Sequence, residues 1–204
     1  MSTLADNQIS NDSRYPTLLR RGHKYEFCLG QRVPVGGFYG PLDVSFGNDG
    51  WFYVLNRWEQ FQNVPRNRYV PVTIDDEYGE FIFPKIDGKP EIQGKEKFPS
   101  PVMCTIDNEG ILYSTDEHAN VVLMLTTSGD TVGWWGEFGS NPGQLNGPSG
   151  ITLDSENNLW IVNCNNHKIQ KFTCDGQFLN GWGDFGTDSN QLNHPWGITI
   201  DPID

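Results

Sequence analysis

An internal repeat constrains this sequence more than any other feature. Residues 129–147 align without a gap with residues 176–194, and the prolines that follow them, Pro148 and Pro195, are 47 residues apart. Pro101 lies another 47 residues upstream, and Pro41 opens an earlier copy that carries an insertion. A fixed period of this length indicates a repeat architecture, in which each unit packs against its neighbours.

The same kinds of residue recur at fixed distances from each opening proline. A short polar or glycine residue lies six positions after it and predicts a turn. Twelve positions after it is an aromatic residue, and fifteen positions after it is Asn or Asp. The aromatic residues are Tyr53, Tyr113 and Trp160, and the short polar ones are Asn56, Asp116 and Asn163.

The third copy gives the clearest strand pattern. Strands are predicted at 150–154, 159–162, 168–172 and 178–182, with a turn at Asp175-Gly176. The second run is almost entirely apolar and is expected to be buried on both faces, whereas the third alternates and should leave one face in water. No segment has a convincing helical pattern. Four antiparallel strands every 40–50 residues or so predict a β-propeller blade.

The third copy resembles an NHL repeat. The motifs that carry the resemblance are Pro148-Ser-Gly-Ile-Thr-Leu-Asp, Asn158-Leu-Trp-Ile-Val-Asn, Asn166-His-Lys-Ile-Gln-Lys-Phe, Gly181-Trp-Gly-Asp-Phe-Gly and Gln191-Leu-Asn-His-Pro. The likeness extends over residues 41–204 and is loosest in the first copy. The triplet that names the family has Lys168 in place of Leu, and the second copy reads Ala119-Asn120-Val121 there. The resemblance implies a six-bladed, TolB-like ring.

We therefore predict an all-β chain of four-stranded antiparallel blades that forms part of such a ring. The expected order is a flexible segment (1–22), the edge strand and linker of the closing blade (23–40), a blade with an insertion (41–100), an NHL-like blade (101–147), an NHL blade (148–194), and the first strand of the next blade (195–204, with the strand at 196–200). Residues 79–97 should supply the outer strand of the first blade and a linker. About three blades leave open sheet edges, so the remaining blades would come from a longer chain, of which this is an N-terminal fragment, or from a second copy. The N-terminal edge strand favours the longer chain.

Composition excludes several classes of partner. The chain has 14 Lys and Arg against 26 Asp and Glu, a net charge of −12, which speaks against nucleic acid binding. No apolar run approaches the ~18 residues that a membrane span requires.

The N-terminus has neither the basic nor the apolar region of a signal peptide, which favours a cytoplasmic location. The four cysteines (28, 104, 164 and 174) show no metal or disulfide spacing, and Cys164 and Cys174 are expected to be free thiols.

Candidate binding residues lie on the loops expected at one face of the blades. They are Asn56, Arg57, Trp58, Asp116, Glu117, His118, Asn163, Asn165, His194 and Trp196. The strand-end residues among them could instead tie down their own loops by local hydrogen bonds. The histidines His118, His167 and His194 lie on blade loops at three different repeat positions, so they need not converge. His167 is expected to hydrogen-bond within its own loop.

The resemblance also permits a test for catalysis. Related propellers include amidating lyases and gluconolactonase-like enzymes, which place metal ligands beside the residue that follows each opening proline. Here that residue is Leu42, Val102, Ser149 or Trp196, none of which is a good ligand for Zn²⁺ or Ca²⁺. We therefore predict no catalytic residue, metal or cofactor, and a non-catalytic scaffold that binds a protein or peptide. The insertion at 57–69 combines Arg with aromatic residues, the types enriched in binding hot spots. A metal-dependent lyase or lactonase-like hydrolase remains the alternative.

Overall fold

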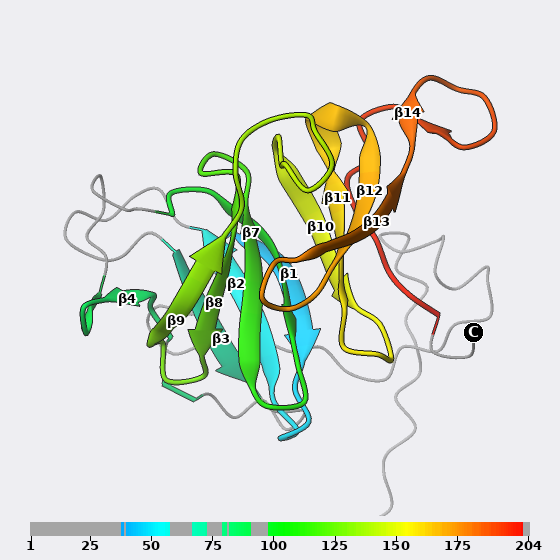
Figure 1. Ribbon diagram of the computed structural model, residues 1–204. Helices are drawn as coiled ribbons and strands as arrows, with labels where there is room; N and C mark the ends of the chain where they lie inside the picture. The colour runs from blue at the N-terminus through cyan, green and yellow to red at the C-terminus, as the bar shows by residue number, and fades with distance from the viewer. Residues whose placement is uncertain are drawn as a thin grey trace, which may run out of the picture.

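The computed structural model describes residues 38, 40–57, 67–72, 79–80, 82–90 and 98–201, and the regular elements among them are β-strands apart from one 3-10 turn (Figure 1). The predicted N-terminal segment, nearly all of the predicted closing edge strand and Trp58 lie outside them. No helix within these ranges is long and apolar enough to cross a membrane. The strands are β1 (Pro41–Phe46), β2 (Phe52–Arg57), β3 (Asn67–Val72), β4 (Lys85–Ile86), β5 (Lys89–Pro90), β6 (Pro101–Ile106), β7 (Ile111–Asp116), β8 (Val121–Thr126), β9 (Thr131–Trp135), β10 (Pro148–Leu153), β11 (Leu159–Asn163), β12 (Lys168–Phe172), β13 (Phe178–Trp182), β14 (Asp184–Phe185) and β15 (Gln191–Leu192), with one 3-10 turn, η1 (Cys164–Asn166).

Three antiparallel sheets follow one another along the chain. Their strand orders are β1-β2-β3, β6-β7-β8-β9 and β10-β11-β12-β13, which we call blades 1, 2 and 3. The inner strand β6 lies between the inner strands β1 and β10, so the blades are arranged side by side about these strands. The four strands predicted for the third copy are all confirmed, which establishes the propeller-blade architecture.

Three details differ from the sequence-based expectation. Blade 1 completes its outer position only through a bridge between Ile82 and Tyr69, next to the small β4-β5 hairpin. Gln170 on β12 is buried rather than wet, because its side-chain amide lies 2.7 Å from Nδ2 of the buried Asn163. Residues 196–200 do not form a strand. They contact β10 through the Trp196 carbonyl, but the described residues contain no further strand to complete a ladder with them.

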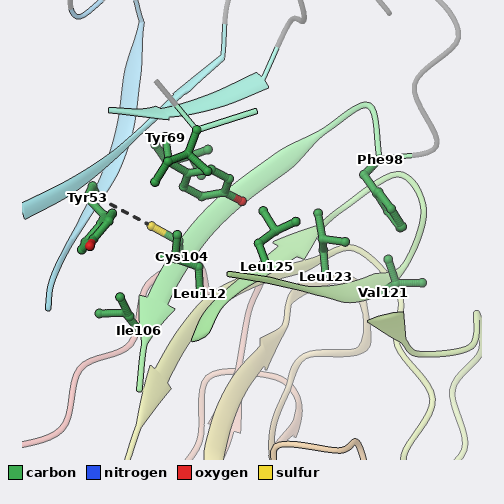
Figure 2. Packing of buried hydrophobic residues seen from close by; sticks show 11 residues of the cluster. Tyr53, Tyr69, Phe98, Cys104, Ile106, Leu112, Val121, Leu123 and Leu125 are labelled. Atoms are coloured by element: carbon green, nitrogen blue, oxygen red, sulfur yellow. Dashed lines mark hydrogen bonds between the residues drawn. The ribbon is translucent and has the colours of Figure 1, made fainter. Parts of the chain in front are cut away.

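The two larger hydrophobic clusters lie between blades, while a smaller one (Val54, Val70 and Val72) lies within blade 1. Figure 2 shows Tyr53 and Tyr69 of blade 1 facing Cys104 and Leu125 of blade 2, with the Cys104 Sγ 4.0 Å from the Tyr53 carbonyl. A second cluster joins blades 2 and 3 through Tyr113, Val122, Leu145, Ile151, Leu159, Ile161 and Phe172. Each blade is therefore stabilised by burying apolar surface against the next blade.

Among the described residues, no blade covers the face of β1 that points away from blade 2. Leu42, Val44 and Phe46 are exposed on alternate positions of this strand. The residues at the equivalent repeat positions of β6, Val102, Cys104 and Ile106, are all buried, and Cys104 and Ile106 pack in the cluster shared with blade 1. The comparison shows that β1 presents the kind of face that a preceding blade covers elsewhere in the chain.

An aromatic side chain closes the hairpin between the first two strands of each blade. The Tyr113 hydroxyl donates to Asp107 Oδ2 (2.9 Å), and Trp160 Nε1 donates to Asp154 Oδ2 (2.9 Å). In blade 1, the Tyr53 hydroxyl donates instead to Asp49 Oδ2 (2.6 Å). These contacts explain why aromatic residues recur twelve positions after the opening prolines.

The ion pair at Asp154 makes folding sensitive to acid. Burial tends to raise the pKa of Asp154, but hydrogen bonds from Lys171, the Asn158 backbone and Trp160 outweigh burial and hold that pKa at about 2. Since the pKa is lower in the folded state, the stabilisation is complete above the ordinary value of 3.8 and is lost as the pH falls through about 2.

We expect Asp154→Asn to lower the free energy of unfolding by about 1 kcal/mol at pH 7 and to have almost no effect near pH 2. Urea unfolding at both pH values measures this. Glu156→Gln is the matched control, because Glu156 also reaches Lys171 (3.3 Å) but is largely exposed. An Asp154→Asn effect of equal size at both pH values would contradict the ionic explanation.

Candidate functional site

The predicted binding residues cluster at one end of the blades, which we call the loop face. Each inner strand begins there and each second strand ends there, as the pairs Pro41–Asn56, Pro101–Asp116 and Pro148–Asn163 show. The loops between second and third strands, and those leading into the next blade, therefore gather at this end (Figure 1).

Asp116 holds two of these loops together from inside. Its carboxylate accepts hydrogen bonds from the backbone N–H groups of Ser100 (2.8 Å), His118 (3.0 Å) and Ala119 (2.7 Å), and the residue is only 1% exposed. Burial raises the pKa of Asp116, and the three N–H donors offset part of that rise. The side chain fixes backbone and does not face solvent.

In blade 3, the side-chain amide of Asn163 likewise fixes loop backbone by hydrogen bonds. Its Oδ1 accepts from the Asn146 N–H (2.7 Å) and its Nδ2 donates to the Gln144 carbonyl (2.8 Å). In blade 1, Asn56 makes one local bond from Nδ2 to the Val54 carbonyl (2.9 Å). All three strand-end residues are buried, so the local-hydrogen-bond interpretation describes what the structure shows of them.

The residue after each strand-end residue differs between blades: Arg57 and Glu117 are partly exposed, whereas Cys164 is buried. Arg57 Nη1 donates to Glu117 Oε1 at 3.2 Å, which links blades 1 and 2 through two half-exposed side chains. In blade 3 the equivalent residue is Cys164, whose Sγ lies 4.0 Å from His194 Nδ1. Burial raises the pKa of the Cys164 thiol, and the charge of Glu117 adds to that effect. A row of polar groups thus crosses from blade 1 to the segment after blade 3.

The structure brings together two histidines that the sequence analysis kept apart. The His194 N–H donates to His167 Nδ1 (3.1 Å), and the two rings meet edge to face with their centroids 4.5 Å apart. The ring of His167 therefore bonds to the next connection, while its backbone N–H donates to the Cys164 carbonyl (3.1 Å) within its own loop. His118 remains beside Asp116.

We call this contact, in which a side chain accepts a backbone N–H of the next connection, a clamp. Blade 2 contains an equivalent clamp in which an asparagine replaces the histidine. Asn120, 47 residues before His167, accepts the Gly147 N–H through Oδ1 (2.8 Å). Asn120 and His167 have φ values of 58° and 57°, in the left-handed region. Comparing residues one period apart could have revealed the pair, because Gly147 and His194 are also 47 residues apart.

A pair of substitutions at His167 tests the clamp. Because Nδ1 accepts an N–H, the ring must carry its proton on Nε2. His167→Ala should lower the free energy of unfolding by about 1 kcal/mol, whereas His167→Asn should retain most of it, since Asn performs this role in blade 2. Urea unfolding at neutral pH measures both, with His118→Ala as the control. Equal losses for the Ala and Asn variants would contradict the clamp.

The remaining predicted residues lie at the same end. Asn165 Nδ2 donates to Asn146 Oδ1 (3.2 Å), which joins two loops. Trp196 is 52% exposed, while its carbonyl accepts from the Gly150 N–H and the Ser149 hydroxyl, both at 2.8 Å. The backbone of Trp196 is thus anchored to β10 and its ring is displayed to solvent.

The cysteines and acidic groups offer less chemistry. Cys104, Cys164 and Cys174 are free, as predicted for the last two, while Cys28 lies outside the described residues. Within the described ranges, no three His, Cys, Asp or Glu side chains are grouped so that they could hold a metal ion.

A cleft of about 380 Å³, which sequence reasoning missed, lies at the opposite end of blades 2 and 3. Two of its three carboxylates, Asp107 and Asp154, are already engaged by their own hairpins, and the third is Asp201.

Comparison with known proteins agrees with this architecture. Residues 145–172, from the end of one connecting loop to the end of β12, match the NHL repeat family. The matched segment covers the first three strands of the third blade. The blades of this chain are those of a β-propeller, as its structural neighbours show. No curated protein sequence matches the chain.

Three solved structures illustrate the likeness. A catalytically inactive virginiamycin B lyase from Staphylococcus aureus with quinupristin has a TM-score of 0.52 and 20% identity, over 77% of this chain and 44% of that one. Hydrazine synthase from Kuenenia stuttgartiensis gives 0.54 and 12%, over 87% and 43%. A nidogen/laminin complex gives 0.50 and 17%, over 80% and 53%. The chain spans about half the length of these structures, and the likeness concerns the fold.

Proposed function

We propose that this NHL-repeat chain is a non-catalytic scaffold that binds a protein or peptide through its loop face. The observation that carries the proposal is the contrast between buried and displayed residues there. Asp116 and Asn163 fix the loop backbones from inside, while Arg57, Glu117 and Trp196 are presented outward. A surface held in place before binding loses little entropy on association, and Trp and Arg are enriched in hot spots.

In this proposal the blades that would cover β1 come from a longer chain or from a second copy. The exposed Leu42, Val44 and Phe46 support such a cover. The intact mass of the native protein separates the two sources, because a longer chain exceeds the 23.0 kDa of these 204 residues. If the mass is 23.0 kDa, light scattering decides: a dimer indicates a second copy, whereas a soluble monomer would contradict the proposal that further blades cover β1.

Selection from a random 12-residue peptide library displayed on phage, with the chain immobilised, tests the binding face. Peptides enriched on the wild-type chain should lose at least about tenfold in affinity with Trp196→Ala or Arg57→Ala. Phe46→Ala, a change of exposed apolar surface on β1, is the control and should leave them unchanged. Peptides that depend on Phe46 and not on the loop face, or no enrichment at all, would contradict the proposal.

A further inference from the structure

Exposed aromatic residues in this chain are of two kinds. Trp182 is 49% exposed, but its repeat equivalent Trp135 packs on Phe172 of the next blade, with ring centroids 5.0 Å apart. The exposure of Trp182 therefore reflects its position beyond the last complete contact between blades. Phe138 and Phe185 are also one period apart, yet they are 66% and 65% exposed. Phe138 has complete blades on both sides, so its exposure belongs to the repeat itself.

The two phenylalanines stand on loops of the same construction. Phe138 forms a parallel bridge with Leu145, and Phe185 forms the equivalent pair with Leu192 between β14 and β15. The hydrogen bonds that close the loops correspond one to one: Gly139 N–H to the Leu145 carbonyl (3.0 Å) and Gly186 N–H to the Leu192 carbonyl (3.1 Å).

A glutamine braces each loop. Gln144 Oε1 accepts the Asn141 N–H at 3.1 Å, and Gln191 Oε1 accepts the Asp188 N–H at 3.0 Å. The loop with β14 projects from blade 3 (Figure 1). Both rings are thus held out on braced backbone, an arrangement that limits the entropy lost when a partner covers them.

The same loops are acidic. Residues 136–147 contain Glu137 and residues 183–193 contain Asp184 and Asp188, and neither range contains Lys or Arg. Glu137 and Asp184 are exposed, and neither forms an ion pair with another described residue. The whole chain carries a net charge of −12, which adds long-range attraction for a cationic partner.

We propose that Phe138 and Phe185, with the carboxylates beside them in sequence, form a docking surface for a basic peptide segment that also carries apolar side chains. This rests on the proposed function and specifies its partner. Within blade 3, an aromatic ring and a carboxylate together already accommodate a cation. Lys171 Nζ lies 5.3 Å from the centroid of the Trp160 ring and 2.8 Å from Asp154 Oδ2. A partner lysine or arginine finds the same two kinds of group, ring and carboxylate, on the loops.

Fluorescence polarisation with two labelled 12-residue probes tests the proposal. One probe repeats Lys-Leu-Gly four times and the other repeats Glu-Leu-Gly four times, so only charge differs. We expect the basic probe to bind and to weaken as salt is raised. Phe185→Ala and Phe138→Ala should each weaken it by about fivefold or more, and Asp184→Asn by about threefold. Val132→Ala, at an exposed position on β9, should leave it unchanged.

The outcomes separate this inference from the proposed function. Equal binding of the acidic probe, or binding of neither probe at about 1 mM, would overturn the basic-partner inference. Binding of the basic probe that Val132→Ala weakens as much as Phe185→Ala would overturn the assignment to these loops. In any of these cases, peptides that bind through Trp196 and Arg57 would still support the loop face as a binding surface. All four variants change exposed side chains, and near-ultraviolet circular dichroism confirms that each one is folded.

Discussion

Replacing Trp135 with alanine is expected to lower the free energy of unfolding by about 3 kcal/mol, the range seen when a large aromatic is removed from a packed position. The indole of Trp135 extends from blade 2 onto Phe172 of blade 3, and its Nε1 donates to the Cys174 carbonyl at 3.0 Å. Alanine removes the ring contact between the blades and leaves that carbonyl without its donor. Urea unfolding followed by intrinsic fluorescence measures the loss.

The chain supplies the control for this experiment. Trp182 has the same place in blade 3 and is 49% exposed, so Trp182→Ala should change the free energy of unfolding by less than about 0.5 kcal/mol. If the two variants are equally destabilised, the effect of Trp135 arises within its own blade. The proposed dependence of each blade on the next would then be wrong.

The repeat explains how much of this fold could be predicted. Strands at 159–162, 168–172 and 178–182 were predicted because alternation and β-branched residues mark them locally, and β11, β12 and β13 confirm them. The segment 196–200 has the same local pattern but forms no strand, because a strand also requires a partner for its ladder. Gln170 was misplaced for a related reason, since its burial depends on Asn163 in the neighbouring strand.

The candidate site was predicted by position but not by contact. Arg57, Glu117 and Trp196 lie on the expected face, because strand direction alone determines which end their loops reach. The contact between His167 and His194 was missed, because it depends on a left-handed backbone at His167 and on the path of the next connection. Patterns of hydrophobicity carry no information on either.

The largest effect on the loop face is expected from the strand-end residue of blade 2. Asp116→Ala should lower the free energy of unfolding by about 3 kcal/mol, because three backbone N–H groups, those of Ser100, His118 and Ala119, lose their acceptor in a buried site. Urea unfolding measures the change. Trp196→Ala is the control at the same face, since it alters an exposed ring and should have little effect on stability.

The equivalent residues of the other blades decide how this loss is explained. Asn163 satisfies the Asn146 N–H and the Gln144 carbonyl, so Asn163→Ala should cost about 2 kcal/mol. Asn56 reaches only the Val54 carbonyl, so Asn56→Ala should cost about 1 kcal/mol. All three are buried, and removing them leaves cavities of similar size. Losses that decrease in the order Asp116, Asn163, Asn56 would show that hydrogen bonds to the loop backbone stabilise this face. Three equal losses would assign the effect to packing. That result would contradict the role of these hydrogen bonds in holding the binding face.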